Sequence, residues 1–394
     1  MSPKRVATHA FYPLLNYSVD SIKIKKDKLT KIIEPQKKKR PISYSSHIDS
    51  HIYSYYANKL SNLYEAKLAE LNLEDSILAF RSLGKSNIEF AFEAFESIKN
   101  YGACGVVALD LTKFFDTLDH NILKKQWADL LNEKYLPEDH YNLFRSISKF
   151  STVDKLKLYE TLGISPHNPK CKRTRICEPK EFREVVRNGG LISVNNGNKG
   201  IPQGSPISAL LSNIYMLKFD LAMKNYVGDF GGFYFRYCDD MLIIVPIEIR
   251  DKVAAFVRTH IKELKVDINP TKTEIRTFTK SNGSLVSDKP LQYLGFLFNG
   301  ENIYLRSASL ARYSERMKRG VSFAKATMRK RNKSRINRGE PVKPLYKKDL
   351  FDKYSHLGSR NFITYGLRAA RIMKSKTIKK QLKPLWKKLQ SEIE

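Results

Sequence analysis

The sequence predicts an α+β protein in which an antiparallel sheet carries neighbouring carboxylates and a basic helical region follows the sheet. Three observations predict this. Asp239 and Asp240 lie side by side between two apolar runs that are typical of a strand hairpin. Residues 106–109 form another apolar strand pattern, and it ends on Asp110. Residues 301–394 contain 26 Lys and Arg against 7 Asp and Glu, and no clear strand pattern follows residue 306.

The composition indicates a polyanionic partner and a large core. The net charge of +30 and the pI near 9.8 exceed what solubility requires, and such an excess is typical of proteins that bind nucleic acid. A chain of 394 residues and 45.5 kDa can bury a large core and suggests two or three subdomains. No run of about 18 apolar residues is present, so we expect no transmembrane helix and no membrane partner.

The start of the chain and its cysteines indicate a cytoplasmic location. The first residues lack the apolar core and the cleavage site of a signal peptide. The four cysteines, Cys104, Cys171, Cys177 and Cys238, are too few and too scattered for a disulfide framework. A zinc site at Cys171 and Cys177 would need a fourth ligand that the sequence lacks, so we interpret them as reduced thiols.

Periodicity predicts the elements in order along the chain. Residues 1–45 are a basic segment of mixed character, and residues 151–199 are a basic insertion rich in turn formers. Expected helices cover residues 47–78, 88–98, 119–131, 205–221 and 248–264, and the region after residue 306 is helical. Expected strands cover residues 106–110, the hairpin 235–245, and 291–298 with 303–305, which flank Asn299-Gly300 as a hairpin turn.

The carboxylates at these strand ends form the candidate chemical centre. Three of them on adjacent strands can hold two Mg²⁺ ions about 3.5–4 Å apart, the arrangement that stabilises in-line phosphoryl displacement. The alternative is that Asp239 and Asp240 are ordinary polar residues of an exposed turn. Their apolar flanks would bury them, however, and burying two carboxylates without a cation costs free energy. The expected cofactor is Mg²⁺, two ions per site, with Mn²⁺ as the alternative.

Four motifs in order resemble the reverse transcriptase family over about residues 35–390. They are Ala108-Leu-Asp-Leu-Thr-Lys-Phe-Phe-Asp116, Gly200-Ile-Pro-Gln-Gly-Ser-Pro-Ile-Ser208, Tyr237-Cys-Asp-Asp240 and Leu291-Gln-Tyr-Leu-Gly-Phe296. The resemblance implies a right-hand polymerase with fingers at 46–105, a palm at 106–300 that contains the insertion 151–199, and a helical thumb at 301–394. It also implies an RNA-directed DNA polymerase that makes cDNA, with an RNA template, a DNA/RNA hybrid and dNTPs as partners.

The resemblance assigns roles around the metals. It makes Asp110 and Asp239 the main ligands, with Asp240 assisting and the Leu111 carbonyl completing the shell. It places Phe115 as a gate that excludes a ribose 2′-hydroxyl. Since Phe114 is adjacent, the alternative is that Phe115 belongs to the core.

Other positions match by resemblance as well. Gln203 would approach the incoming nucleotide and the template base. Arg81 and Lys85 would hold the triphosphate, and Lys272 would donate a proton to pyrophosphate, although solvated basic residues are the alternative reading of all three. The remaining assignments are a primer grip at Tyr293, Leu294 and Gly295 and nucleic-acid contacts at Arg312, Arg316, Arg319, Arg329, Lys330 and Arg331.

Within the family, the chain is most similar to bacterial defence-associated reverse transcriptases, in particular their type 2 group. That similarity implies an adjacent structured non-coding RNA and a role against phage. A group II intron-like or retron-like enzyme is the alternative, and so is a polymerase that primes on protein or works without a template. A non-enzymatic RNA-binding protein would have no use for Asp239 and Asp240.

Overall fold

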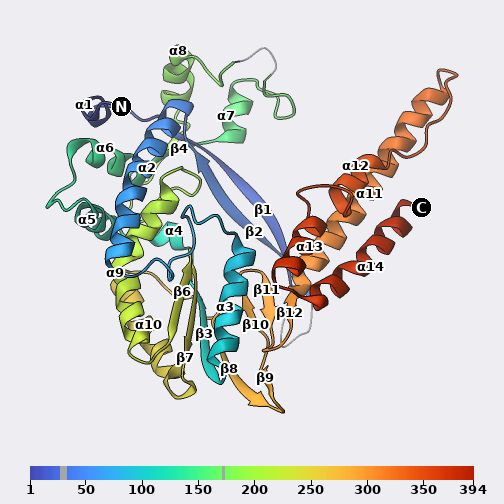
Figure 1. Ribbon diagram of the computed structural model, residues 1–394. Coiled ribbons are helices and arrows are strands. Elements are labelled where there is room, and N and C mark those ends of the chain that lie inside the picture. The colour runs from blue at the N-terminus through green and yellow to red at the C-terminus, as the bar shows by residue number, and fades with distance from the viewer. Residues whose placement is uncertain (27–32, 171–173) are drawn as a thin grey trace. The chain divides into compact units, whose positions relative to one another are not determined.

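The computed structural model describes residues 1–26, 33–170 and 174–394, which fall into two units (Figure 1). Cys171 therefore lies outside the described residues. The first unit contains residues 1–81, 111–225 and 256–269, and the second contains 82–110, 226–255 and 270–394. The boundaries expected for fingers, palm and thumb stay predictions.

The first unit is mainly helical and contains one small sheet. Its helices are α1 (Pro3–Ala7), α2 (His47–Glu70), α4 (Phe114–Thr117), α5 (His120–Leu130), α6 (Glu138–Ser148), α7 (Lys155–Thr161), α8 (Pro179–Glu181), the π-helix η1 (Phe182–Arg187), most of α9 (Ser208–Gly228) and the second half of α10 (Arg250–Glu263). Its strands are β1 (Leu14–Lys26), β2 (Ile33–Tyr44), β4 (Ser151–Asp154) and β5 (Ile192–Val194), in the order β2-β1-β4-β5.

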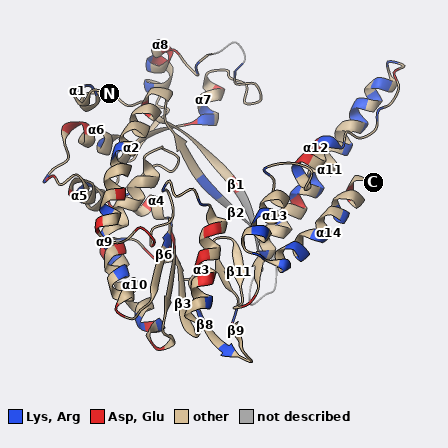
Figure 2. Cartoon of the chain, viewed as in Figure 1, with Lys and Arg blue, Asp and Glu red and all other residues tan. Residues whose placement is uncertain are grey.

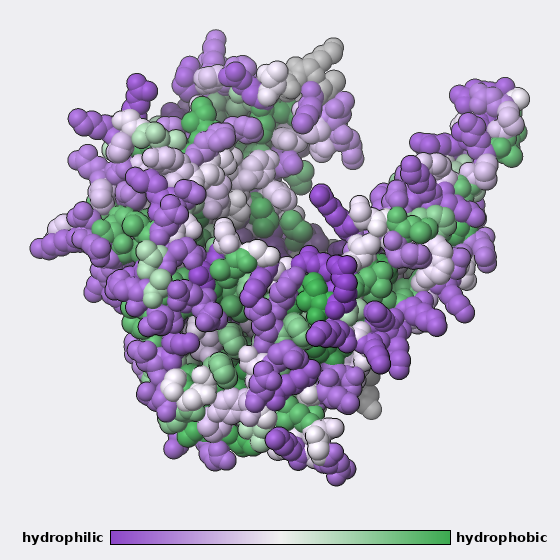
Figure 3. Space-filling model, viewed as in Figure 1, coloured by the Kyte–Doolittle hydropathy of each residue, from purple (hydrophilic) through white to green (hydrophobic). Residues whose placement is uncertain are grey.

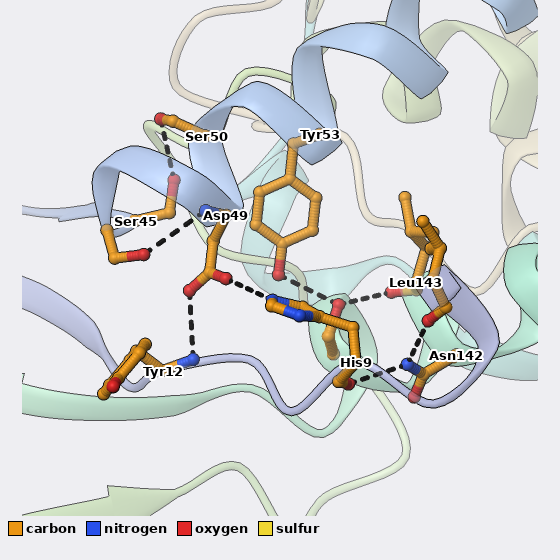
Figure 4. Close-up of polar contacts among 11 residues, drawn as sticks. His9, Tyr12, Ser45, Asp49, Ser50, Tyr53, Asn142 and Leu143 are labelled. Carbon is orange, nitrogen blue, oxygen red and sulfur yellow. Dashed lines mark hydrogen bonds and ion pairs between the residues drawn. The ribbon is translucent and has the colours of Figure 1, made fainter. Parts of the chain in front are cut away.

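The N-terminal segment is tied to α2 and α6 by a polar network (Figure 4). Asp49 of α2 is 1% exposed, and its two carboxylate oxygens accept from His9 Nε2 at 2.8 Å and from the Tyr12 amide at 3.0 Å. Asn142 of α6 donates to the carbonyls of Val6 and His9 at 2.8 and 2.9 Å. A buried carboxylate with these partners is stable only when the segment is docked. The sequence predicted no element here, and residues 14–26 and 33–44 form the long antiparallel hairpin β1–β2.

The second unit is built on a five-stranded antiparallel sheet in the order β6-β7-β3-β8-β9. The strands are β3 (Cys104–Asp110), β6 (Phe233–Tyr237), β7 (Asp240–Val245), β8 (Glu274–Ser281) and β9 (Ser284–Ser287). All seven residues of β3 are buried, as expected for the central strand of a covered sheet. The predicted strand and hairpin are therefore confirmed, whereas the pair β8–β9 was not predicted.

A second sheet and five helices complete this unit. The sheet β10-β11-β12 contains β10 (Leu291–Tyr293), β11 (Phe296–Phe298) and β12 (Ile303–Leu305). The helices are α3 (Asn87–Tyr101), α11 (Ser307–Ile336), α12 (Lys348–Tyr354), α13 (Phe362–Ile372) and α14 (Lys376–Ile393), with the short 3₁₀ turn η2 (Ile247–Ile249). One core joins them, since Phe95 of α3, Phe278 of β8, Phe298 of β11 and Leu389 of α14 are buried in one cluster.

The turn predicted at Asn299-Gly300 is a longer loop. Phe298 pairs with Ile303, so the connection between β11 and β12 contains four residues, and Asn299 Oδ1 accepts from the amides of Glu301 and Asn302. The two-residue turn is Leu294-Gly295, which divides the predicted strand 291–298 into β10 and β11.

Basic residues are distributed along helices of the second unit, as Figure 2 shows for α11 and α14. In Figure 3 this region shows hydrophilic side chains with smaller hydrophobic patches between them. In the described ranges, no helix combines the length and the apolar composition that crossing a membrane requires.

A charged cluster connects α3 with α13. Glu89 forms a capping box with Ser86 at the start of α3, and Arg368 of α13 lies 2.7 Å from its carboxylate. Although burial alone would raise the pKa of Glu89, hydrogen bonds from Ser86 and Arg368 lower it to about 2. A carboxyl group whose pKa is lowered by folding contributes stability above its ordinary pKa, and loses it as the pH falls towards the lowered value.

We therefore predict that Glu89→Gln loosens the α3–α13 contact at pH 7 and has little effect near pH 2. The cost is about 1 kcal/mol, because the pair is partly exposed. Hydrogen exchange of the α3 and α13 amides at both pH values measures it. Glu93→Gln on the same helix, which breaks only the exposed pair with Lys85, is the control. Equal protection in the two variants at pH 7 would contradict the prediction.

Candidate active site

The fold brings the three predicted carboxylates to one end of the five-stranded sheet. Asp110 is the last residue of β3, and it pairs in register with Asp240, the first residue of β7. Tyr237 pairs with Asp240, so Cys238 and Asp239 form the two-residue turn between β6 and β7. All three aspartates belong to the second unit. Their adjacency thus follows from strand register.

The turn that carries Asp239 is strained, and a hydrogen bond from a buried arginine stabilises it. Cys238 has φ +59°, a left-handed conformation that costs a non-glycine residue about 1 kcal/mol or more. The side chain of Arg236 is completely buried, and its Nη1 donates to the Cys238 carbonyl at 3.1 Å. Sequence reasoning missed Arg236, although a single arginine inside an apolar strand pattern was the available signal. We assign it the role of holding the turn.

Like charges dominate the electrostatics of this end of the sheet. Burial, together with the charges of Asp239 and Asp110, raises the pKa of Asp240 to about 7 against partial compensation by Lys272 and Arg306. Lys272 Nζ lies 2.5 Å from Asp110 Oδ2. The carboxylates therefore form a negative centre for which Lys272 supplies a direct cationic contact.

The donor set fits magnesium by its chemistry. Carboxylate oxygens are the ligands that Mg²⁺ prefers, and a cation would offset both the burial and the neighbouring charges that raise the pKa of Asp240. As the side chains are placed, however, no three His, Cys, Asp or Glu groups in the described part of the chain could hold a metal ion. The ammonium of Lys272 stands beside Asp110 in the position of a counter-ion.

The predicted primer grip is a tight turn held by α3. Leu294 and Gly295 have φ +44° and +95°, and two positive values are typical of a type I′ turn. Asn87 Nδ2 donates to the Leu294 carbonyl at 3.0 Å and to Tyr365 Oη at 2.9 Å. Tyr293 is 3% exposed, and its hydroxyl has no hydrogen-bond partner within the described ranges. Burial first, then the charges of Asp240 and Tyr237, raise the pKa of Tyr293.

The first unit contains Leu111, Phe115 and Gln203. Phe114 is buried at 3% exposure, whereas Phe115 is only half-buried, so Phe114 is the core residue of the pair. The Ile201 amide donates to the Phe115 carbonyl at 2.9 Å, which sets the Gly200–Gly204 loop beside Phe115. Gly204 has φ +114°, and a Cβ there would lie 2.8 Å from the Ser43 carbonyl. Gln203 is exposed on this loop and Leu111 is buried.

The two predicted triphosphate ligands are engaged in other contacts. The Arg81 side chain is 3% exposed, lies 2.7 Å from Glu65, and donates to the carbonyls of Glu74 and Ile77. Lys85 pairs with Glu93 at 2.6 Å. Arg81 belongs to the first unit and Lys85 to the second. As placed, Arg81 stabilises the turn after α2, and the nucleotide-binding roles of both residues stay predictions.

The predicted thumb contacts all lie on α11. Arg312, Arg316, Arg319, Arg329, Lys330 and Arg331 are exposed. Arg319 also pairs with Glu315, one turn earlier on the helix, at 2.8 Å.

Comparison with known proteins identifies a family. The sequence profile described as reverse transcriptase (RNA-dependent DNA polymerase) matches residues 24–298, well over half of the chain. No curated protein matches the sequence.

Similar solved structures include telomerases from two yeasts. Apo telomerase from Candida tropicalis is 13% identical with a TM-score of 0.43, over 76% of this chain and 51% of that chain. Telomerase from Candida albicans in complex with a TWJ fragment of telomeric RNA is 12% identical with a TM-score of 0.41, over 98% of this chain and 58% of that chain. The chain thus spans little more than half the length of either telomerase. At TM-scores this low, no functional conclusion rests on them.

We predict that Phe115→Val raises the incorporation of ribonucleotides relative to deoxynucleotides. The half-buried ring can contact a sugar, whereas the buried Phe114 ring cannot without unpacking. One lost steric clash is worth about 1–3 kcal/mol of discrimination, or about 10- to 200-fold. Single-nucleotide addition of each sugar type measures the ratio. Phe114→Val is the matched control, and we expect it to lower stability by about 1–3 kcal/mol without changing the sugar ratio. The reverse outcome would move the gate to Phe114.

Proposed function

Because the chain belongs to the reverse transcriptase (RNA-dependent DNA polymerase) family, we propose that it makes DNA on an RNA template by adding deoxynucleotides to a primer 3′ end. The catalytic class is that of an RNA-directed DNA polymerase, a nucleotidyltransferase. One observation supports the proposal above the others. Asp110 and Asp240 are register neighbours, and Asp239 lies in the adjoining turn.

The residues of the site have separable tasks in this proposal. Asp110, Asp239 and Asp240 would hold Mg²⁺, which supplies charge neutralisation at the transferring phosphoryl group when bound. Arg236 keeps the Cys238-Asp239 turn in place through its bond to the Cys238 carbonyl. Lys272, which contacts Asp110, is the proposed proton donor to the leaving pyrophosphate. Phe115 excludes the 2′-hydroxyl, and Gln203 approaches the base pair being formed.

The template in this proposal is a structured non-coding RNA, and the biological role is defence against phage. The similarity of the Ile201-Pro202-Gln203-Gly204-Ser205-Pro206 segment to defence-associated enzymes supports both statements. Sequencing the RNA and DNA that co-purify with the protein tests them. A single abundant structured RNA with matching cDNA is the expected result, and random cellular RNA would contradict it. An intron RNA would instead identify the group II-like alternative.

We predict that Asp239→Asn lowers Mg²⁺-dependent DNA synthesis on an RNA template by about a thousandfold or more, because a lost metal ligand removes several kcal/mol of transition-state stabilisation. Primer extension measures the rate, and RNA binding by the variant should remain within about twofold, since the basic surfaces lie elsewhere. Asp251→Asn removes a carboxylate that is 71% exposed in the same unit and is the matched control.

Two results would contradict the assignment. One is undiminished synthesis by Asp239→Asn. The other is a product whose sequence does not follow the RNA template, which would favour an untemplated polymerase. Product that stays attached to the protein after denaturation would identify protein priming.

We also predict that replacing Arg329, Lys330 and Arg331 with alanine flattens the salt dependence of nucleic-acid binding and shortens the DNA products. Each phosphate contact contributes about −0.9 to the log–log slope for duplex DNA, so a loss of two or three contacts is measurable. Single-nucleotide addition at saturating template should not change. Salt titrations and product lengths of wild type and variant test whether these residues contact phosphates. An unchanged slope with full-length products would show that they only face solvent.

A further inference from the structure

The basic helices of the second unit line an open pocket of about 600 Å³. Residues of α11, α12 and the start of α13 line it, together with the loop 355–361. Small-molecule sites in proteins have volumes of about 300–1,000 Å³, so the pocket can hold a group the size of one nucleotide. A double helix, whose major groove alone is about 12 Å wide, cannot enter a space of that size.

The walls of the pocket carry an excess of positive charge. Arg312 and Arg316 of α11, Lys353 of α12 and Arg360 of the loop line it, with Asp352 as its one acidic group. None of these four cations forms an ion pair with another described residue, whereas Lys318 and Arg319 on the same helix pair with Glu392 and Glu315. Arg312 and Arg316 are one turn apart, so they repel each other without an anion. Burial and the charge of Arg312 also lower the pKa of Arg306 nearby.

Aromatic side chains form the other part of the lining. Tyr313 and Phe362 stack with ring centroids 5.2 Å apart, and Tyr354 meets Tyr313 edge-on at 6.4 Å. Tyr313 Oη donates to the Tyr354 carbonyl at 2.6 Å, which fixes the rings to the backbone. Rings and guanidinium groups together are the partners on which unpaired bases stack.

The loop that presents Arg360 is held rigidly. Asn361 Nδ2 donates to the carbonyls of Asp352 and Ser355 at 2.9 and 2.7 Å, and a Cβ at Gly358 would lie 1.9 Å from the Asp352 carbonyl. Arg360 itself has φ +53°, a conformation that glycine adopts without cost. Strain of this kind persists where the surrounding structure enforces it, and it is concentrated at ligand sites.

We propose that this pocket binds one nucleotide outside any duplex, with Arg312, Arg316 and Arg360 on its phosphate and the aromatic residues against its base. The proposal rests on the proposed function for the identity of its main source, an unpaired residue of the bound nucleic acid. A free nucleoside triphosphate has the same chemistry and is the other source. An acidic peptide would satisfy the charges but would leave the aromatic lining unused.

The left-handed conformation of Arg360 provides a variant that we expect to keep the fold, because glycine adopts this conformation without strain. Arg360→Gly removes one pocket cation and relieves a left-handed residue. Lys374→Gly is its matched control, since Lys374 has φ +50°, lies between α13 and α14, and does not line the pocket. Both variants lose one positive charge, so a difference between them reports the pocket and not the net charge.

The experiment measures equilibrium binding of a labelled eight-nucleotide single strand over a range of salt. For Arg360→Gly we expect affinity about tenfold weaker and a log–log salt slope smaller by about 0.7, the value for one phosphate contact of a single strand. Lys374→Gly should match the wild type. Equal effects of the two variants would overturn the proposal, and so would equally strong competition by a poly-glutamate peptide.

Two further arms separate the sources and the two proposals. If millimolar ATP displaces the strand from wild type but not from Arg360→Gly, the pocket takes free nucleotides as well, and the proposal stands. If ATP has no effect, an unpaired residue of the strand is the ligand. DNA synthesis on an RNA template is measured in parallel. If the wild type makes no DNA but Arg360→Gly still weakens strand binding, the proposed function is overturned and the nucleotide pocket stands. Normal DNA synthesis, with strand binding by Arg360→Gly equal to that of the wild type, would overturn the proposed nucleotide pocket alone.

Discussion

The repulsion among three carboxylates at one end of a covered sheet is the constraint on which the second unit depends. Strand register sets Asp110 beside Asp240, and burial, together with the charges of Asp239 and Asp110, raises the pKa of Asp240 to about 7. The chain tolerates this arrangement because other groups hold it. The buried Arg236 fixes the turn, and Lys272 contacts Asp110. Sites of this kind are maintained at a cost in stability, and the surrounding core must supply the difference.

Helix α3 connects the turn beside this site with α13. Its first residue, Asn87, donates hydrogen bonds to the Leu294-Gly295 turn and to Tyr365 of α13. Glu89 of the α3 capping box accepts a hydrogen bond from Arg368, which also belongs to α13. Movement of α13 relative to the turn would therefore break charge-assisted and neutral hydrogen bonds together. The position of the turn and the position of α13 are coupled through the start of one helix, and the coupling needs no residue from the other unit.

The sequence predicted the elements with strong periodicity and the motif residues, and it missed those defined by long-range pairing. The strand that ends on Asp110 and the hairpin around Asp239 are readable because apolar runs flank them. The N-terminal hairpin was invisible, because residues 14–44 are mostly polar and their pairing depends on register and on docking through Asp49. The longer loop after Asn299 shows the same limit, since local turn preference does not specify which residues close a hairpin. The contacts of Arg81 could not be predicted either, because they depend on Glu65, sixteen residues away on α2.

Charge alone does not separate binding residues from solvated ones, and the structure adds the missing criterion. On α11 some cations have acidic partners one turn away or on α14, and these pairs contribute little beyond solubility. Others face a space shared with further cations, where Asp352 is the one acidic group, and form no ion pair with another described residue. Holding like charges together costs free energy unless a ligand neutralises them, so unpaired cations around a cavity indicate binding more strongly than the same number of cations spread along a helix. By that criterion the uneven charge of this chain matters less through its total of +30 than through the few places where the fold leaves it uncompensated.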